Sequence, residues 1–165
     1  MERILVSACL LGRPVRYDGA AKPVADDLFA RWRSEGRLVP FCPEVSGGLT
    51  VPRPAAEIVP AAGGGAAVLA GTARVLTASG DDVTEAFVNG ARLALDCARR
   101  AGARIALLKE GSPSCGVHRI HDGTFQGRSL PGEGITAALL AQAGLRVFTE
   151  SELPSLASFL DSPAP

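Results

Sequence analysis

Residues 81–108, DDVTEAFVNGARLALDCARRAGARIALL, decide how this 165-residue chain folds. From residue 81 to residue 101, apolar side chains recur at the spacing of one helix face, and the glycine that follows is typical of a helix C-terminus. Residues 104–108 form a short continuous apolar run, which predicts a strand buried on both faces. A helix that leads directly into a buried strand is the repeating unit of a parallel α/β sheet.

The same signals recur on both sides of this stretch. Further strands are predicted over residues 3–8, 37–41 and 145–148, and further helices over 26–35, 135–143 and 152–159. Trp32 is expected in the core. We therefore predict an α/β fold, a Rossmann-like three-layer sandwich with a mainly parallel sheet and small β-hairpin excursions. Residues 1–160 are expected to form one domain, and residues 161–165 a flexible tail.

The small excursions are predicted in two places. Residues 57–60, 66–69 and 73–77 are expected to form short strands around the turn Gly63-Gly64-Gly65. Residues 117–126 predict a hairpin that turns at Asp122-Gly123, a dipeptide preferred in tight hairpin turns.

Composition narrows the classes of protein that this chain can be. Hydrophobic residues make up 47% of it and charged residues 21%, which excludes an intrinsically disordered chain. The 17 basic and 17 acidic residues leave no net charge, whereas proteins that hold long nucleic acids carry a basic excess. No apolar run reaches the roughly 18 residues of a membrane-spanning helix, and the apolar stretch before Cys9 is too short for an export signal. We expect a cytoplasmic protein with reduced thiols and no membrane partner; its oligomeric state is left open.

Three of the four cysteines, Cys9, Cys42 and Cys115, directly follow predicted strands. Because ligands bind outside the carboxyl ends of parallel strands, we expect these thiols to converge on one crevice. Cys97 lies inside the long helix and is expected to pack as a small apolar residue. Three thiolates leave one coordination position open, as in catalytic metal sites, and soft thiolates favour iron–sulfur clusters or zinc.

Two neighbours of these cysteines have useful chemistry. Glu44 lies two residues beyond Cys42, on the same side of an extended segment, and a carboxyl group in a partly dry pocket can exchange protons. Ser112 precedes Cys115 in a turn that is rich in Gly and Pro. Its hydroxyl group either donates to a reacting oxygen or water, or stabilises the turn.

Two other patterns are weaker. His118 and His121 have the ligand type for zinc, but their odd separation along a hairpin points them to opposite faces, which disfavours joint ligation with Cys115. Gly132-x-Gly134-x-x-Ala137 resembles a dinucleotide-binding fingerprint, but no predicted strand leads into it.

Five blocks of the sequence together resemble the thiouracil desulfurase family. They are Ser7-Ala8-Cys9-Leu10-Leu11-Gly12, Arg16-Tyr17-Asp18-Gly19, Phe41-Cys42-Pro43-Glu44-Val45-Ser46-Gly47-Gly48-Leu49, Pro52-Arg53-Pro54 and Lys109-Glu110-Gly111-Ser112-Pro113-Ser114-Cys115-Gly116. The resemblance implies a [4Fe-4S] cluster held by Cys9, Cys42 and Cys115, and catalytic roles for Glu44 and Ser112. It also implies a desulfidase that removes sulfur from thiolated uracil or thiouridine monophosphate without net redox change. The substrate sulfur would bind the open iron, and the products would be uracil or UMP and sulfide.

The expected partner is therefore a small thiopyrimidine base or nucleotide, and long nucleic acid is not expected. Candidate substrate-binding residues are Arg16, Lys22, Ser46 and Lys109. Two alternatives stay open at this stage: a zinc-thiolate hydrolase that uses the same cysteines, and a non-catalytic nucleotide-binding sensor. The sequence does not distinguish the 2-thio from the 4-thio position.

Overall fold

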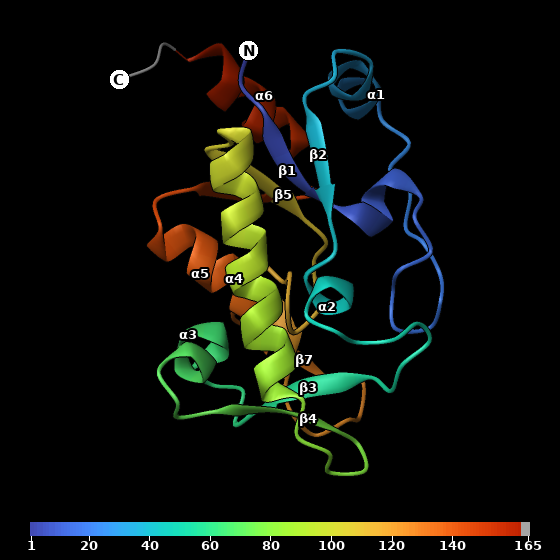
Figure 1. The fold of residues 1–165 in the computed structure, drawn as a ribbon, viewed down its shortest axis with the longest axis vertical. Coiled ribbons are helices and arrows are strands. Elements are labelled where there is room, and N and C mark those ends of the chain that lie inside the picture. The colour runs from blue at the N-terminus through green and yellow to red at the C-terminus, as the bar shows by residue number, and fades with distance from the viewer. Residues whose placement is uncertain (163–165) are drawn as a thin grey trace.

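A computed structural model describes residues 1–162 of the chain. Its centre is a parallel sheet of four strands in the order β2-β1-β5-β8 (Figure 1). The strands are β1 (Ile4–Ser7), β2 (Leu38–Phe41), β5 (Ile105–Leu108) and β8 (Arg146–Thr149). The predicted α/β fold with a mainly parallel sheet is thus confirmed.

Helices cover both faces of this sheet, which makes three layers. Ile4 and Ile105 pack on one face against α1 (Asp27–Ser34) and α6 (Leu153–Asp161), where Trp32 is buried as predicted. Leu5 and Ala106 point the other way and pack against α4 (Thr84–Ala101) and α5 (Ile135–Gln142). Because successive side chains alternate between the two faces, strands covered on both sides are apolar throughout, which is the pattern that the sequence shows.

Short elements lie beyond the carboxyl ends of the parallel strands, from the level of these strand ends in Figure 1 down to its lower end. They are the 3-10 helix η1 (Ala8–Leu11), α2 (Pro43–Ser46), α3 (Gly64–Leu69), and two antiparallel hairpins, β3 (Ala56–Val59) with β4 (Arg74–Thr77) and β6 (Arg119–His121) with β7 (Ser129–Pro131). A third apolar cluster, which includes Ile58, Phe87 and Ile120, anchors the hairpins to α4.

Two predictions about these short elements are wrong. Residues 66–69 belong to helix α3, not to a strand. A Cβ atom on Gly65 would lie 2.3 Å from the Gly134 carbonyl oxygen, so α3 forms where the start of α5 can dock closely against it. The hairpin of residues 117–126 instead turns through a wider loop, residues 122–128. That loop is held by Asp122, whose Oδ1 accepts from Thr124 N at 3.0 Å, and by Gly123 N, which donates to Glu57 Oε1 at 2.9 Å.

The remaining boundaries differ by a few residues. α4 begins at Thr84 rather than Asp81, because Asp81 and Asp82 still pack against β4. Asp161, the first residue of the predicted tail, is the last residue of α6. The rest of that prediction, from residue 163 on, lies outside the described residues.

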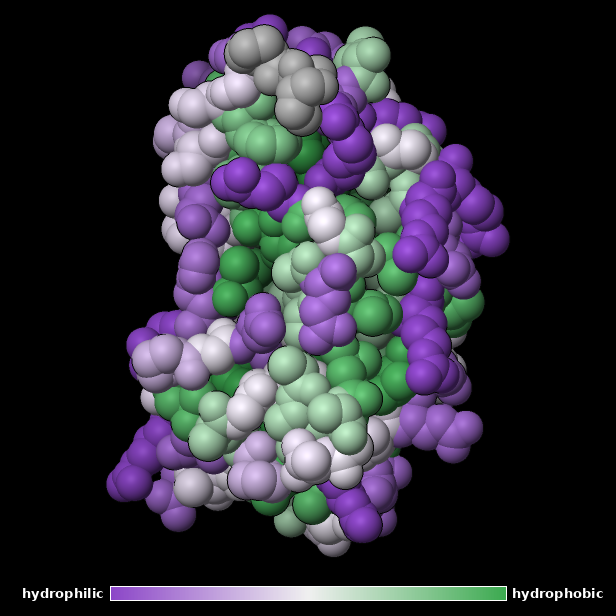
Figure 2. Space-filling view, turned by 90° about the vertical axis from the view of Figure 1, so that its left-hand side faces the viewer, coloured by the Kyte–Doolittle hydropathy of each residue, from purple (hydrophilic) through white to green (hydrophobic). Residues whose placement is uncertain are grey.

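The outer surface mixes apolar and polar side chains. Figure 2 shows the side of the molecule nearest α3 and α5, where patches of apolar side chains lie between hydrophilic ones. In residues 1–162, no helix combines the length and the apolar character that crossing a bilayer requires.

Candidate functional site

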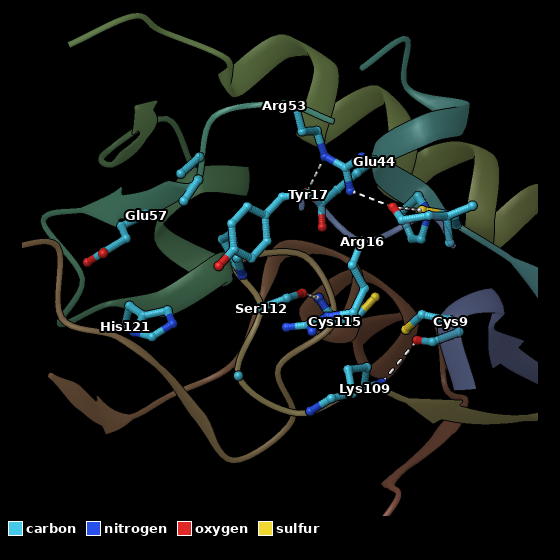
Figure 3. Close-up of a pocket in the computed structure, with 18 of the residues that line it drawn as sticks. Cys9, Arg16, Tyr17, Glu44, Arg53, Glu57, Lys109, Ser112, Cys115 and His121 are labelled. Carbon is cyan, nitrogen blue, oxygen red and sulfur yellow. Dashed lines mark hydrogen bonds and ion pairs between the residues drawn. The ribbon is translucent and has the colours of Figure 1, made fainter. Parts of the chain in front are cut away.

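A cavity of about 440 Å³ opens at the carboxyl ends of β1, β2 and β5 (Figure 3). The three cysteines that follow these strands all line it: Cys9 from η1, Cys42 just before α2, and Cys115 from the loop after β5. Cys9 and Cys115 are buried and Cys42 is half-buried. Cys97 lies on α4, away from the cavity lining, and packs against the apolar cluster between α4, α5 and the sheet.

The three thiols lie close enough to influence one another. Burial, and to a smaller extent the neighbouring Cys42, raise the pKa of Cys9 to about 11, although Arg16 and Lys109 oppose the shift. Burial also raises the pKa of Cys115 to about 12, with Glu44 and the other two thiols acting in the same direction. The pKa of Cys42 is raised chiefly by burial. A positively charged centre among these sulfurs would favour their ionised form.

Glu44 faces the same cavity from the first turn of α2. Its side chain is 16% exposed, and its Oε1 accepts from Arg53 Nε at 3.1 Å. Burial raises the pKa of Glu44, and the Arg53 guanidinium opposes that shift. Glu44 and Cys42 both line the cavity, as expected, but the backbone geometry that brings them there differs from the expected one. The segment is a helical turn that starts at Pro43, a residue suited to the first helical position, rather than an extended strand.

Ser112 stabilises its turn and still faces the cavity. Its Oγ accepts from Cys115 N at 2.7 Å and from Ser114 N at 3.2 Å. A hydroxyl group has two acceptor lone pairs and one donor proton, so these two bonds leave the proton of Ser112 for another partner. The turn-forming and chemical interpretations of Ser112 are thus compatible.

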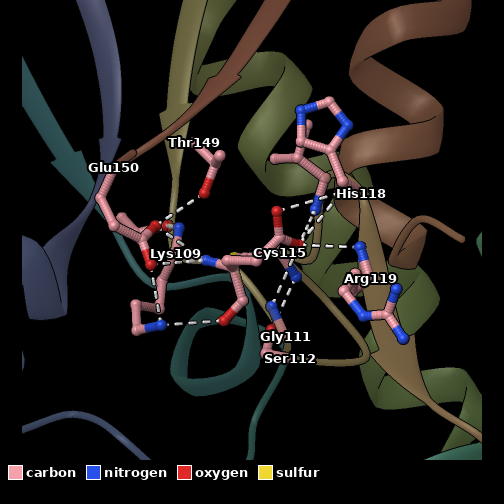
Figure 4. A network of polar contacts seen from close by, with 11 residues as sticks. Lys109, Gly111, Ser112, Cys115, His118, Arg119, Thr149 and Glu150 are labelled. Atoms are coloured by element: carbon pink, nitrogen blue, oxygen red, sulfur yellow. Dashed lines mark hydrogen bonds and ion pairs between the residues drawn. The ribbon is translucent and has the colours of Figure 1, made fainter. Parts of the chain in front are cut away.

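Sequence reasoning missed Glu110, which organises the loop of Cys115. Figure 4 shows the polar contacts around Cys115, His118 and Arg119. Its Oε1 accepts from the backbone amides of Val117 at 2.8 Å, His118 at 3.0 Å and Arg119 at 3.0 Å. These partners are backbone groups seven to nine residues further along the chain, so no pattern of side chains in the sequence predicts the contacts. One half-buried carboxylate therefore fixes the path of the loop on both sides of Cys115.

The candidate substrate-binding residues divide into two pairs. Arg16 and Lys109 line the cavity; Arg16 Nη1 lies 4.0 Å from Asp18 Oδ2, and Lys109 Nζ donates to Glu150 Oε1 at 2.9 Å. The structure places Lys22 and Ser46 on the exposed surface, outside the cavity lining. Lys22 contributes only its backbone amide, which donates to Cys9 O at 3.0 Å.

The weaker sequence patterns also have structural explanations. His121 lines the outer part of the cavity, whereas His118 turns away and its Nε2 lies 2.9 Å from Glu152 Oε1. A Cβ atom on Gly134 would lie 2.4 Å from the Ser114 carbonyl oxygen, so this glycine lets α5 approach the Cys115 loop. Within residues 1–162, no three His, Cys, Asp or Glu side chains are grouped so as to hold one metal ion.

In this three-layer α/β domain, three thiols, a carboxyl group and a hydroxyl group face one cavity beyond the strand ends. This arrangement defines a candidate enzyme with a cysteine-lined centre. A model of the 2-thiouracil desulfurase family matches residues 4–152. The chain belongs to this family.

Two similar proteins extend the comparison. The chain is 47% identical over 150 residues to the uncharacterized protein YbbK of Bacillus subtilis (strain 168), a match that covers 91% of this chain and 97% of that protein. The solved structure of a [4Fe-4S]-dependent thiouracil desulfidase, TudS, matches with a TM-score of 0.87 at 51% identity, and covers 97% of this chain and 98% of that one. The family resemblance seen in the sequence is therefore confirmed.

Proposed function

We propose that this protein is a desulfidase that removes sulfur, as sulfide, from thiolated uracil or thiouridine monophosphate at a [4Fe-4S] cluster held by Cys9, Cys42 and Cys115. Family membership and the similarity to TudS support the reaction class and the cofactor. The observation that carries the residue assignment is that three cysteines, each following a different strand, line one cavity that Cys97 does not line.

The donor set suits such a cluster. Each thiolate of a cluster binds a different iron atom, so its ligands are distributed around a cavity rather than directed at one point. Three soft ligands match the preference of iron–sulfur centres, and three rather than four leave one iron without a protein ligand. Arg16 and Lys109 supply positive charge beside the Cys9 sulfur.

When bound, the cluster supplies a thiophilic Lewis acid that polarises the thiocarbonyl group of the substrate. Glu44 accepts a proton from the water whose oxygen bonds to the thiocarbonyl carbon. The Ser112 hydroxyl group, whose proton is not needed in its own turn, keeps that proton and donates a hydrogen bond to the same oxygen, which stabilises the negative charge that develops as the oxygen loses its second proton. That second proton passes to the departing sulfur, so the C–S bond breaks, sulfur leaves as hydrosulfide and the carbon keeps a C=O bond. Glu44 then releases the first proton to hydrosulfide or to solvent. In the overall reaction, water and the thiocarbonyl compound give the carbonyl product and hydrogen sulfide. Atoms and electrons balance, so no electron acceptor is needed.

The cavity has room for more than a base. Its volume of about 440 Å³ falls within the roughly 300–1,000 Å³ of pockets that hold drug-sized ligands. Arg16 and Lys109, both at its wall, are the cations available to a nucleotide phosphate. Lys109 is held by Glu150 at 2.9 Å, whereas Arg16 lies 4.0 Å from Asp18, so Arg16 is the stronger candidate for this contact.

Sulfide release by anaerobically reconstituted protein tests the proposal, with 2-thiouracil, 4-thiouracil and the two thiouridine monophosphates as separate substrates. The expected result is a brown protein that forms sulfide and the oxygenated pyrimidine in equal amounts. An active, colourless protein with stoichiometric zinc would instead identify the zinc-thiolate hydrolase. Nucleotide binding without sulfide release, by protein that contains the cluster, would identify the sensor.

A further inference from the structure

Arg53 is a buried cation beside the cavity to which the reaction proposed above gives no part. Its side chain is only 5% exposed and lies beside Glu44 in the cavity wall (Figure 3). Its guanidinium group donates in three directions. Nε donates to Glu44 Oε1 at 3.1 Å, Nη1 to the Thr50 carbonyl at 3.1 Å, and Nη2 to the Val15 carbonyl at 2.9 Å. A buried charge is costly unless it is paired and hydrogen-bonded, and this one is both.

These contacts join two parts of the cavity wall that are distant in the sequence. Glu44 belongs to α2, whereas Val15 begins the loop that brings Arg16 into the cavity. The Arg53 backbone adds a second tie to that loop, because its amide donates to the Tyr17 carbonyl at 2.8 Å. A rigid planar fork can hold partners in several fixed directions at once, so Arg53 sets the position of the Glu44 carboxylate relative to the loop.

The Val15 carbonyl links this arrangement to the thiols. It accepts from Arg53 and also from the Cys42 thiol, with a sulfur–oxygen distance of 3.9 Å. A cysteine that binds metal does so as a thiolate, which has no proton to donate. Arg53 then remains as the donor that satisfies the Val15 carbonyl when Cys42 is ionised.

We propose that Arg53 is a positioning residue that acts through Glu44: it holds the carboxylate at the point of the cavity where the attacking water is activated. The inference rests on the proposed function, in which Glu44 takes that proton. Because the hydrogen bonds of the Arg53 guanidinium go to Glu44, Thr50 and Val15 and none goes to a cysteine sulfur, we expect its loss to lower kcat for the free base 2-thiouracil without changing KM or cluster content.

The test uses R53K in the full chain, reconstituted anaerobically, with 2-thiouracil as substrate so that no phosphate contact contributes. Lysine keeps the charge but not the fork. We expect kcat to fall roughly 10- to 100-fold, as for a misplaced catalytic group, with KM and the visible absorption of the cluster per protein unchanged. R104K is the matched control, because Arg104 makes a comparable but exposed pair with Glu2, 2.9 Å away, and its kcat should equal that of the unmodified protein.

A double-variant comparison distinguishes positioning from general support of the fold. If Arg53 acts through Glu44, R53K should not slow E44Q further, because the carboxylate it positions is already absent. A merely structural residue would lower both rates by the same factor. R53Q, which keeps a neutral donor toward Glu44, is the second variant and carries the same expectation.

Three results would overturn the inference: kcat of R53K close to that of the unmodified protein, equal factors in the two backgrounds, or loss of the fold in both R53K and R53Q. Absence of sulfide release by the unmodified, cluster-containing protein would instead overturn the proposed function. Sulfide release by this protein is therefore measured before any variant is compared with it.

Discussion

At the scale of single residues, the Ser112 oxygen accepts hydrogen bonds from two backbone amides, which leaves its own proton free for a partner in the cavity. Ser112→Ala removes that donor, and we expect kcat for thiopyrimidine to fall about 100-fold, as when one donor to a developing oxyanion is removed. Ser112→Thr keeps the hydroxyl group and should retain most of the activity. Steady-state kinetics at equal cluster content are the measurement. An Ala variant as active as the Thr variant would leave Ser112 with its turn alone.

The cysteines allow a second prediction at this scale. Cys9→Ala, Cys42→Ala and Cys115→Ala should each lose bound iron and acid-labile sulfide, because each removes one of the three cavity ligands. Cys97→Ala should keep both, since Cys97 packs among apolar side chains of α4 and its neighbours. The measurement is the amount of iron and acid-labile sulfide bound per protein after anaerobic reconstitution. Loss of the cluster in Cys97→Ala alone would contradict the assignment.

Some site residues could be predicted from sequence and others could not, for a physical reason. The sequence predicts Cys9, Cys42 and Cys115 as site residues because each follows a strand that is recognised by its apolar run. Arg53 and Glu110 were not, because their partners include main-chain groups that only the folded chain brings near. The two prolines that flank Arg53 and the charge of Glu110 inside a turn were the only local signals.

At the scale of elements, two glycines bring α2 against α4. A Cβ atom on Gly90 would lie 2.0 Å from the Pro43 carbonyl oxygen, and one on Gly47 would lie 2.1 Å from the Ala86 carbonyl oxygen. Glycine inside a helix costs about 1 kcal/mol relative to alanine, so its presence at position 90 reflects this close approach. The contact fixes the short helix that carries Glu44 and follows Cys42.

Gly90→Ala should therefore destabilise the protein although alanine is the better helix former. We expect α2 to be displaced, with a free energy of unfolding lower by roughly 1–3 kcal/mol, as for overpacked positions, and with reduced turnover. Asn89→Ala is the control, because Asn89 is exposed on the same helix and gains helix propensity without a clash. Chemical unfolding and kcat measure both effects. Equal stability and activity of the two variants would show that the contact is dispensable.

The elements themselves were predictable in unequal measure. The four parallel strands follow from short apolar runs, and the long helix, predicted over residues 81–101, follows from its helical periodicity. Helix α3 could not be predicted in this way, because its docking depends on contact between Gly65 and Gly134. Small residues give no strong hydrophobic pattern in the sequence. The loop of residues 122–128 likewise depends on Glu57, which lies far away in the sequence.

At the scale of the whole molecule, Glu150 joins β8 to the loop after β5. Burial alone would raise the pKa of Glu150, but hydrogen bonds from Lys109, Thr149 and the Glu110 amide outweigh it and lower the pKa below the ordinary value of 4.5. A carboxyl group with a lowered native pKa stabilises the fold above its unfolded-state pKa. That stabilisation is lost as the pH falls through the native value.

Glu150→Gln should lower the free energy of unfolding by roughly 1–3 kcal/mol near neutral pH, the range for hydrogen bonds to a charged group. The difference from the unmodified protein should shrink as the pH falls from about 5 toward 3, because the native carboxylate is then protonated. Urea unfolding across this range is the measurement. A difference that stays constant with pH would show that the Glu150 charge contributes nothing to stability.

The central claim concerns the whole molecule, since the three ligands come from three strands of one sheet. A crystal structure of the anaerobically reconstituted protein tests it most directly. We expect four iron and four sulfide positions in the cavity, bonds from the sulfurs of Cys9, Cys42 and Cys115, and one iron without a protein ligand. A single metal ion in their place, or a cluster bound through Cys97, would contradict the account.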